Sequence, residues 1–158
     1  MGINIRQKGA GAEREIADEL NTIINVVRLQ LGMKVMAKPQ VQRNQNQTAV
    51  GGCDLVGTYG YAIEVKRQEQ LSINTWWKQC CISAEEVCAS PVLIFRQNKQ
   101  KWRVILNTNV PSSCGMYYHR VRAEISWDDF KAMFREAALA EFKGAELDDS
   151  GEQVLFPQ

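Results

Sequence analysis

The sequence has few of the residues that build zinc knuckles or disulfide frameworks. It contains one histidine and five cysteines, an odd number, and no two cysteines have Cys-x-x-Cys spacing. This usage favours reduced thiols in a cytoplasmic protein. No apolar run approaches the roughly 18 residues that a membrane span requires, so we expect no membrane association. The first basic residues are not followed by an apolar segment, so we expect no secretory signal.

The length indicates one domain, and the charge distribution favours an anionic partner. The 158 residues, 45% of them hydrophobic, suit a single folded domain, which we place at 1–145 with an acidic tail at 146–158. Residues 1–123 hold 16 Lys and Arg against 9 Asp and Glu, whereas residues 124–158 hold 3 against 9. A basic body favours an anionic partner, although surface charge also segregates without function.

The apolar periodicity predicts an N-terminal helix followed by a polar loop. Apolar residues recur at steps of three and four, which predicts a helix over 12–31 that ends at Gly32. Residues 34–37 are expected to form a short strand. The Gln- and Asn-rich segment 39–52 is predicted to be a loop that contributes nothing to the core. The residues of the apolar helix face are Ala12, Ile16, Leu20, Ile23, Ile24, Val27 and Leu31.

The remainder of the chain predicts hairpins and two more helices. Residues 54–56 and 61–66 are expected to pair around a glycine-bearing turn. These elements together predict a mixed α/β domain, with helices packed on a small sheet. The other predicted elements are a helix over 74–88, strands over 92–96 and 102–106, a loop over 107–115, a strand over 116–121, and a helix over 127–143 that Ser126 caps.

Asp54 and Glu64 are the most informative residues. If the turn takes three residues, Asp54 lies directly across from Glu64, where like charges repel each other. A divalent cation would relieve that repulsion, and hard oxygen ligands suit Mg²⁺ or Mn²⁺. Lys66 shares a strand face with Glu64, so its ammonium group could orient a nucleophile or stabilise developing charge. The alternative is a charged solvent face, and a turn of two or four residues would break the alignment.

Glu13 is the third candidate carboxylate. On a helical wheel it falls within the apolar sector, beside Leu20 and Ile24, where an unpaired charge is costly. It could therefore reach Asp54 and Glu64 from the helix. The alternative is that the first helical turn extends past the core, where a glutamate favours the helix dipole.

Basic residues flank the first helix and the candidate site. They could clamp the phosphates of a nucleic acid, although a solvated basic face is an equal alternative for any one of them. These candidates for DNA binding are Arg6, Lys8, Arg14, Lys38, Arg43 and Arg67.

Three motifs occur in an order that resembles a known nuclease group. Residues 6–15 read Arg-Gln-Lys-Gly-Ala-Gly-Ala-Glu-Arg-Glu, and Cys53-Asp54-Leu55-Val56 and Ile63-Glu64-Val65-Lys66 follow. Asp-(x9)-Glu-x-Lys after such a helix resembles the PD-(D/E)XK nuclease superfamily. Taken together, the motifs are similar to those of the archaeal-type Holliday junction resolvases, over roughly residues 5–107.

The resemblance implies a restriction-endonuclease-like α/β core and a homodimeric, magnesium-dependent enzyme that nicks two opposed strands of a four-way DNA junction. By analogy, Glu13, Asp54, Glu64 and the Val65 carbonyl would hold the metal. Lys66 would act on the attacking water, and Arg14 would contact DNA. The alternatives are a nuclease of the same superfamily that cuts linear or damaged duplex, and a DNA-binding protein with an inert acidic cluster. A phage source, with the host cytoplasm as its location, fits so compact a resolvase.

Two departures from the pattern bear on the site. Cys53 occupies the position before the aspartate, where the superfamily often has proline. Archaeal-type enzymes place a functional serine in the preceding loop, but the first serine of this chain is Ser72. That role is therefore vacant or taken by Thr48 or Arg43.

Overall fold

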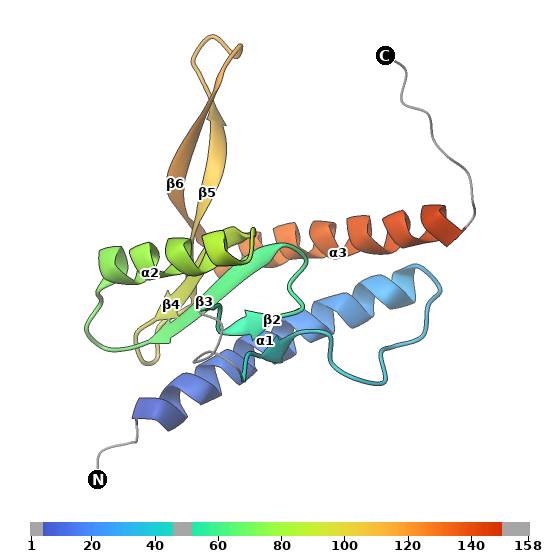
Figure 1. Cartoon of the computed structure of the whole chain (residues 1–158), viewed down its shortest axis with the longest axis horizontal. Helices are drawn as coiled ribbons and strands as arrows, with labels where there is room; N and C mark the ends of the chain where they lie inside the picture. Colours follow the sequence, from blue (N-terminus) through green and yellow to red (C-terminus); the bar gives the residue numbers. More distant parts are fainter. Residues whose placement is uncertain (1–4, 46–51, 150–158) are drawn as a thin grey trace.

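The structure is a computed structural model that describes residues 5–45 and 52–149 (Figure 1). A four-stranded sheet has the order β3-β4-β5-β6, in which β3 and β4 are parallel and the other neighbours are antiparallel. The predicted α/β class, a small mixed sheet flanked by helices, is confirmed. The elements are α1 (Ile5–Gln30), β1 (Gln42–Arg43), β2 (Leu55–Val56), β3 (Tyr61–Arg67), α2 (Ile73–Glu86), β4 (Ser90–Arg96), β5 (Arg103–Pro111), β6 (Tyr118–Ser126) and α3 (Trp127–Asp149).

Apolar side chains cover both faces of this sheet. On one face, α1 and α3 pack against alternate residues of the strands, such as Ile63, Ile94 and Val104. On the other face, Trp76 and Cys80 of α2 pack against Leu93, Phe95 and Ile105. The predicted apolar face of α1 is confirmed. Its fully buried members are Ala12, Ile16, Leu20, Ile24 and Val27, while Ile23 and Leu31 are partly buried against them.

The start of α1 differs from the prediction, whereas its end does not. The helix begins at Ile5 and continues through Gly9 and Gly11. A glycine within a helix costs only about 1 kcal/mol, so the other residues of these turns can outweigh it. Gly32 has a φ of 73°, and the Met33 amide donates to the Arg28 carbonyl at 2.9 Å. A left-handed glycine therefore ends the helix, as predicted.

The segment after α1 was predicted incorrectly. Residues 34–37 form no strand, and Val41, inside the predicted polar loop, is 1% exposed within the core. The Asn21 side chain fixes this residue, because it donates to the Val41 carbonyl and accepts from the Val41 amide, each at 2.8 Å. Two hydrogen bonds from one helical side chain thus bring part of this segment into the core. Residues 46–51, and with them Thr48, lie outside the described residues.

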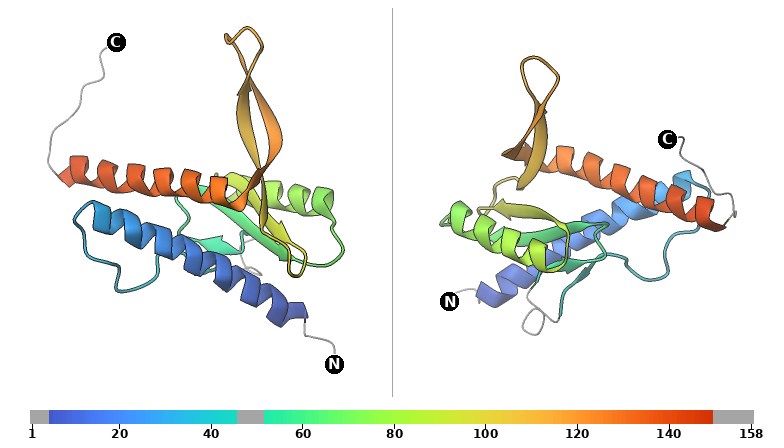
Figure 2. Two further views of the ribbon diagram at one scale, coloured as in Figure 1. Left: turned by 180° about the vertical axis from the view of Figure 1, so that it is seen from behind. Right: turned by 45° about the horizontal axis from the view of Figure 1, so that its top comes forward.

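Strand pairing also differs from the prediction at two places. β2 pairs with β1 in a separate two-stranded sheet rather than entering the ladder beside β3. Residues 107–111, predicted to be loop, continue β5 and pair with β6 as far as Pro111 and Tyr118. Proline is tolerated at the end of a strand, where it costs no ladder hydrogen bond. The resulting two-stranded arm projects from the body of the molecule (Figures 1 and 2).

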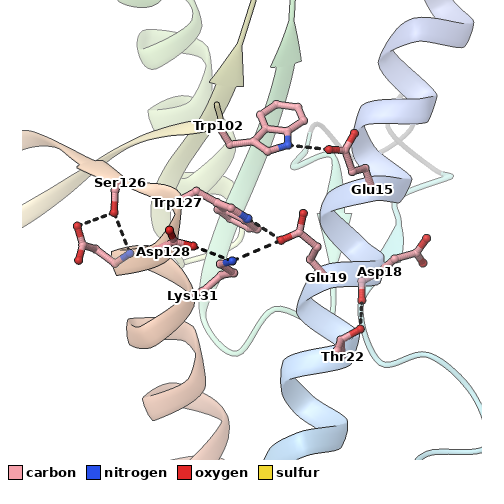
Figure 3. A network of polar contacts seen from close by, with 10 residues as sticks. Glu15, Asp18, Glu19, Thr22, Trp102, Ser126, Trp127, Asp128 and Lys131 are labelled. Carbon is pink, nitrogen blue, oxygen red and sulfur yellow. Dashed lines mark hydrogen bonds and ion pairs between the residues drawn. The ribbon is translucent and has the colours of Figure 1, made fainter. Parts of the chain in front are cut away.

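The start of α3 is fixed to α1 by a polar network (Figure 3). The Ser126 hydroxyl accepts from the Asp129 amide at 3.0 Å, which confirms the predicted cap. The Trp127 indole donates to Glu19 at 2.7 Å, and the indole of Trp102, just before β5, donates to Glu15 at 2.9 Å. These bonds hold α1, which carries Glu13, in a fixed position relative to the sheet. At its other end α3 runs to Asp149, past the predicted end at 143, and residues 150–158 lie outside the described part.

Candidate active site

The candidate carboxylates are buried at the edge of the sheet. Glu64 lies in the middle of β3 and is 3% exposed, while Asp54, just before β2, is 7% exposed. Side chains alternate along a strand, so the apolar neighbours Ile63 and Val65 point into the main core and Glu64 and Lys66 point to the opposite face. A strand that is buried on both sides thus carries a charged pair on one of them.

Hydrogen bonds hold Asp54 beside Glu64. The Asp54 amide donates to the Ile63 carbonyl at 2.9 Å, and the Asp54 side chain accepts from the Val65 amide at 2.6 Å. The Asn44 amide, next to β1, donates to the Asp54 carbonyl at 2.8 Å. Asp54 therefore lies alongside residues 63–65, next to Glu64, as the sequence predicted, although β2 itself pairs with β1.

The electrostatics of the pair favour a bound cation. Burial raises the pKa of Asp54 to about 7, and the negative charge of Glu64 adds to this effect. The Val65 amide and the Lys66 ammonium oppose it, and Glu13 contributes a further small rise. The raised pKa shows first that a charge is poorly solvated at this position, and second that a like charge lies beside it. A divalent cation would offset both the lost solvation and the repulsion between the two carboxylates.

Lys66 forms an ion pair with Glu64. The Lys66 Nζ lies 2.5 Å from Glu64 Oε1, and the lysine side chain is 19% exposed. Burial alone would lower the pKa of Lys66, but the charge and the hydrogen bond of Glu64, followed by the charges of Asp54 and Glu13, raise it overall. Lys66 is therefore a hydrogen-bond donor and a positive charge at neutral pH, not a base.

Glu13 is buried on α1, as predicted, but Arg43 is its partner. The Arg43 Nε lies 2.5 Å from Glu13 Oε2, and Glu13 is 9% exposed. β1 brings Arg43 to this position, because it pairs with Leu55 directly after Asp54. Glu13 is close enough to contribute to the pKa values of both Asp54 and Lys66. The structure thus places Glu13 at the margin of the pair, held by an arginine.

The chemistry of the donors fits Mg²⁺. Within residues 5–45 and 52–149, no three His, Cys, Asp or Glu side chains form a group that could hold a metal ion. Of the three buried carboxylates among these described residues, Asp54 and Glu64 lie side by side. The Val65 carbonyl lies between Glu64 and Lys66 in the chain. Mg²⁺ is often held by one or two carboxylates, with water and substrate phosphates completing its shell. Asp54 and Glu64 suit this mode, and Glu13 as a third ligand stays a prediction.

A basic cleft lies between α1 and the β4–β5 turn. Its volume is about 400 Å³, and its lining includes two predicted DNA-binding residues, Lys8 and Arg67. It also includes Asn98 and Lys99, which sequence reasoning missed. Arg67 donates to the Asn98 side chain at 3.2 Å, so the turn and the end of β3 are linked directly. The signal that could have found these two residues is the Gln-Asn-Lys-Gln-Lys sequence of the turn, one strand away from the Glu-x-Lys motif.

The other predicted DNA-binding residues are more dispersed. Arg14 is exposed on the outer side of α1, and Lys38 is exposed in the segment that precedes β1. Neither lines the basic cleft. Arg6 lies in α1, and its side chain is outside the described part. Their contacts with DNA stay predictions.

Comparison with known proteins places the chain in a family. The model of a family described as "Phage putative PDDEXK endonuclease" matches residues 4–146. Among solved structures, the chain is similar to Hjc of Archaeoglobus fulgidus, a Holliday junction resolvase from an archaeal hyperthermophile. The identity is 16%, the match covers 77% of this chain and 85% of that chain, and the TM-score is 0.41. No curated protein matches. None of the described helices is long and apolar enough to cross a membrane.

Proposed function

This chain belongs to the PDDEXK endonuclease family of phages, a nuclease family, and we propose that it resolves four-way DNA junctions by paired nicks, with Mg²⁺ as cofactor and Mn²⁺ as its substitute. The observation that carries the proposal is the burial of Asp54 and Glu64 side by side, next to Lys66. A buried pair of like charges is costly unless a cation or hydrogen-bond donors compensate for it. The order of the three sequence motifs supports a junction as the substrate.

Each residue at the site has a proposed role. Asp54, Glu64 and the Val65 carbonyl hold the metal, and Glu13 joins them once Arg43 is drawn to a phosphate. The bound metal supplies Lewis acidity and neutralises charge on the phosphodiester. Lys66 keeps its proton, and its ammonium group donates a hydrogen bond to the attacking water or to a phosphate oxygen. The carboxylates and Lys66 thus fix the positions of the positive charges that stabilise the transition state.

The remaining parts of the proposal concern DNA and assembly. Lys8, Arg67 and Lys99 hold phosphates in the basic cleft, while Arg6, Arg14, Lys38 and Arg43 contact the backbone around it. The enzyme acts as a homodimer, because a four-way junction presents two equivalent scissile phosphates related by a two-fold axis. We place it in the cytoplasm, that of the host if the source is viral.

Substrate preference tests the proposal. Labelled four-way junction, linear duplex and single strand are each incubated with the protein in Mg²⁺ or EDTA, and the products are separated on a denaturing gel. We expect paired nicks in the junction only, and only with Mg²⁺. Equal cleavage of linear duplex would replace the junction with duplex as the substrate. Tight binding without any cleavage would indicate a DNA-binding protein with an inert acidic cluster.

Metal affinity should depend on pH through Asp54. The pKa of Asp54 is about 7, so a proton competes with the metal below neutral pH. Between pH 8 and pH 6 the dissociation constant for Mn²⁺ should rise about tenfold, because one proton is displaced. Calorimetry at pH 6.5 in two buffers of different ionisation enthalpy should detect the release of protons on metal binding. A dissociation constant that does not change with pH would contradict this assignment.

Lys99 should contribute to DNA affinity. The side chain is exposed at the mouth of the basic cleft, so Lys99→Gln removes a charge without disturbing the core. Fluorescence anisotropy with labelled junction should show a severalfold weaker affinity, and the slope of log Kd against log [KCl] should fall by about 0.9, the value for one phosphate contact. Lys34→Gln, an exposed lysine after α1, is the matched control. Equal effects of the two substitutions would show that Lys99 makes no specific contact with DNA.

A further inference from the structure

The arm formed by residues 107–122 has two different faces. Beyond Leu106, β5 has left its ladder with β4 and pairs only with β6. Directly paired residues of antiparallel strands point to the same side, so Asn107 with Arg122 and Asn109 with Arg120 form one face. We call this the basic face. The opposite face is more apolar and carries Val110 and Val121.

The charge of the arm favours an anionic partner. Residues 107–123 contain Arg120, Arg122 and His119 and no Asp or Glu. Both arginines are exposed, and Arg122 also donates to the side chain of Asn74 at the start of α2, at 3.1 Å. A run of two arginines and two asparagines on one ribbon face presents donors to phosphates and to base edges.

The arm is shaped before it binds anything. At its tip, the Ser112 amide donates to the Tyr117 carbonyl at 2.7 Å, and the Gly115 amide donates to the Ser112 carbonyl at 2.8 Å. Tyr117 and Tyr118 are 67% and 69% exposed at the end of the ribbon. A preformed ribbon loses little freedom on binding. A two-stranded ribbon also fits the major groove of duplex DNA, which is about 12 Å wide.

The basic face continues a side of the sheet that the active site also uses. Glu64 pairs with Leu93, and Leu93 pairs with Ile105, so the three side chains point to the same side of the sheet. Asn107 and Asn109 follow Ile105 at alternate positions of β5. The base of the arm therefore presents its arginines on the side of the sheet that carries Glu64.

We propose that the arm is a second DNA-binding element, which lies in a groove of duplex DNA with Arg120 and Arg122 against its phosphates. This inference rests on the proposed function, because it assigns the arm to the same substrate. It adds a contact separate from the basic cleft. The arm then grips a duplex segment of the substrate while the carboxylates act on the scissile phosphate.

A paired substitution tests the inference. Arg120→Gln with Arg122→Gln should weaken junction binding about tenfold or more in EDTA, and should lower the salt slope by about 1.8, the value for two phosphate contacts. Arg120→Lys with Arg122→Lys keeps both charges and should restore most of the affinity. Lys34→Gln with Lys143→Gln removes the same charge from exposed positions elsewhere and is the control.

The outcomes separate this inference from the proposed function. If the unmodified protein cleaves the junction and the Gln variant binds as tightly as the control, the arm is not a DNA contact. If the Lys variant binds as weakly as the Gln variant, the positive charges of the arm do not account for its effect on DNA affinity, which contradicts the proposed phosphate contacts. The alternative is that the arm contacts a second copy of the chain. Sedimentation of the unmodified protein and of the Gln variant without DNA tests it: a dimer that dissociates only in the Gln variant would assign the arm to this contact. The loss of junction cleavage expected on replacing Glu64 tests the proposed function and does not depend on any of these results.

Discussion

Replacing Glu64 by alanine should lower junction cleavage at least about 1,000-fold, which corresponds to about 4 kcal/mol of transition-state stabilisation. Glu64 is 3% exposed, is next to Asp54 and pairs with Lys66 at 2.5 Å. Its removal takes away one of the two carboxylates that suit a metal, and it also releases the lysine. Single-turnover cleavage of labelled junction in Mg²⁺ measures the effect.

The same variant should still fold and bind DNA. The substitution removes one charge from a repelling pair, so the thermal midpoint should change little, and binding in EDTA should be equal or slightly tighter. Glu85→Ala removes an exposed carboxylate from α2 and should leave cleavage unchanged. Glu64→Gln, which keeps an acceptor for Lys66, should be as inactive as Glu64→Ala. Full activity in either Glu64 variant would refute the assignment of the active site.

Asp54→Asn should abolish cleavage and yet stabilise the metal-free protein. The folded-state pKa of Asp54, about 7, lies above the ordinary value of 3.8. The stabilising contribution of this proton is complete below about pH 4, and it is lost as the pH rises through 7. The amide of asparagine carries no charge and can still accept from the Val65 amide. At pH 8 in EDTA the variant should therefore be more stable by about 1–3 kcal/mol, and at pH 5 the difference should fall to less than half of that value.

Urea denaturation in EDTA at the two pH values measures this effect. Asp18→Asn, at an exposed position of α1, is the matched control and should change stability by less than about 0.5 kcal/mol at either pH. Adding Mg²⁺ should stabilise the unmodified protein and not the Asp54 variant, because only the former has both carboxylates. A clear loss of stability of Asp54→Asn in EDTA at pH 8 would contradict the repulsion between the two carboxylates.

Regular apolar patterns made much of the fold predictable. The buried face of α1, the helix over 74–88 and the cap at Ser126 follow local rules of spacing and capping, and the structure confirms them. The predicted strand over 116–121 overlaps the start of β6, but residues 107–111 were wrongly predicted as loop. They are mostly polar and exposed, so only their pairing with β6 defines them as strand. The burial of Val41 depends on Asn21, which is distant in sequence and gives no local signal.

The candidate site was predictable in part, for a related reason. Alternation along one strand placed Glu64 and Lys66 on one face, and the short turn brought Asp54 beside them. The pairing of Glu13 with Arg43 needed the β1–β2 contact, which no periodicity reveals. Lys99 joins the basic cleft through the β4–β5 turn, so its role depends on tertiary structure rather than on a motif.

Anomalous diffraction from crystals grown with Mn²⁺ tests the central claim most directly, because it locates the metal without relying on activity. We expect an anomalous peak between the carboxylates of Asp54 and Glu64, close to the Val65 carbonyl, and no peak at this place in the Asp54→Asn protein. A peak elsewhere, or none while Glu64 keeps its ion pair with Lys66, would contradict the claim that these carboxylates form a metal centre.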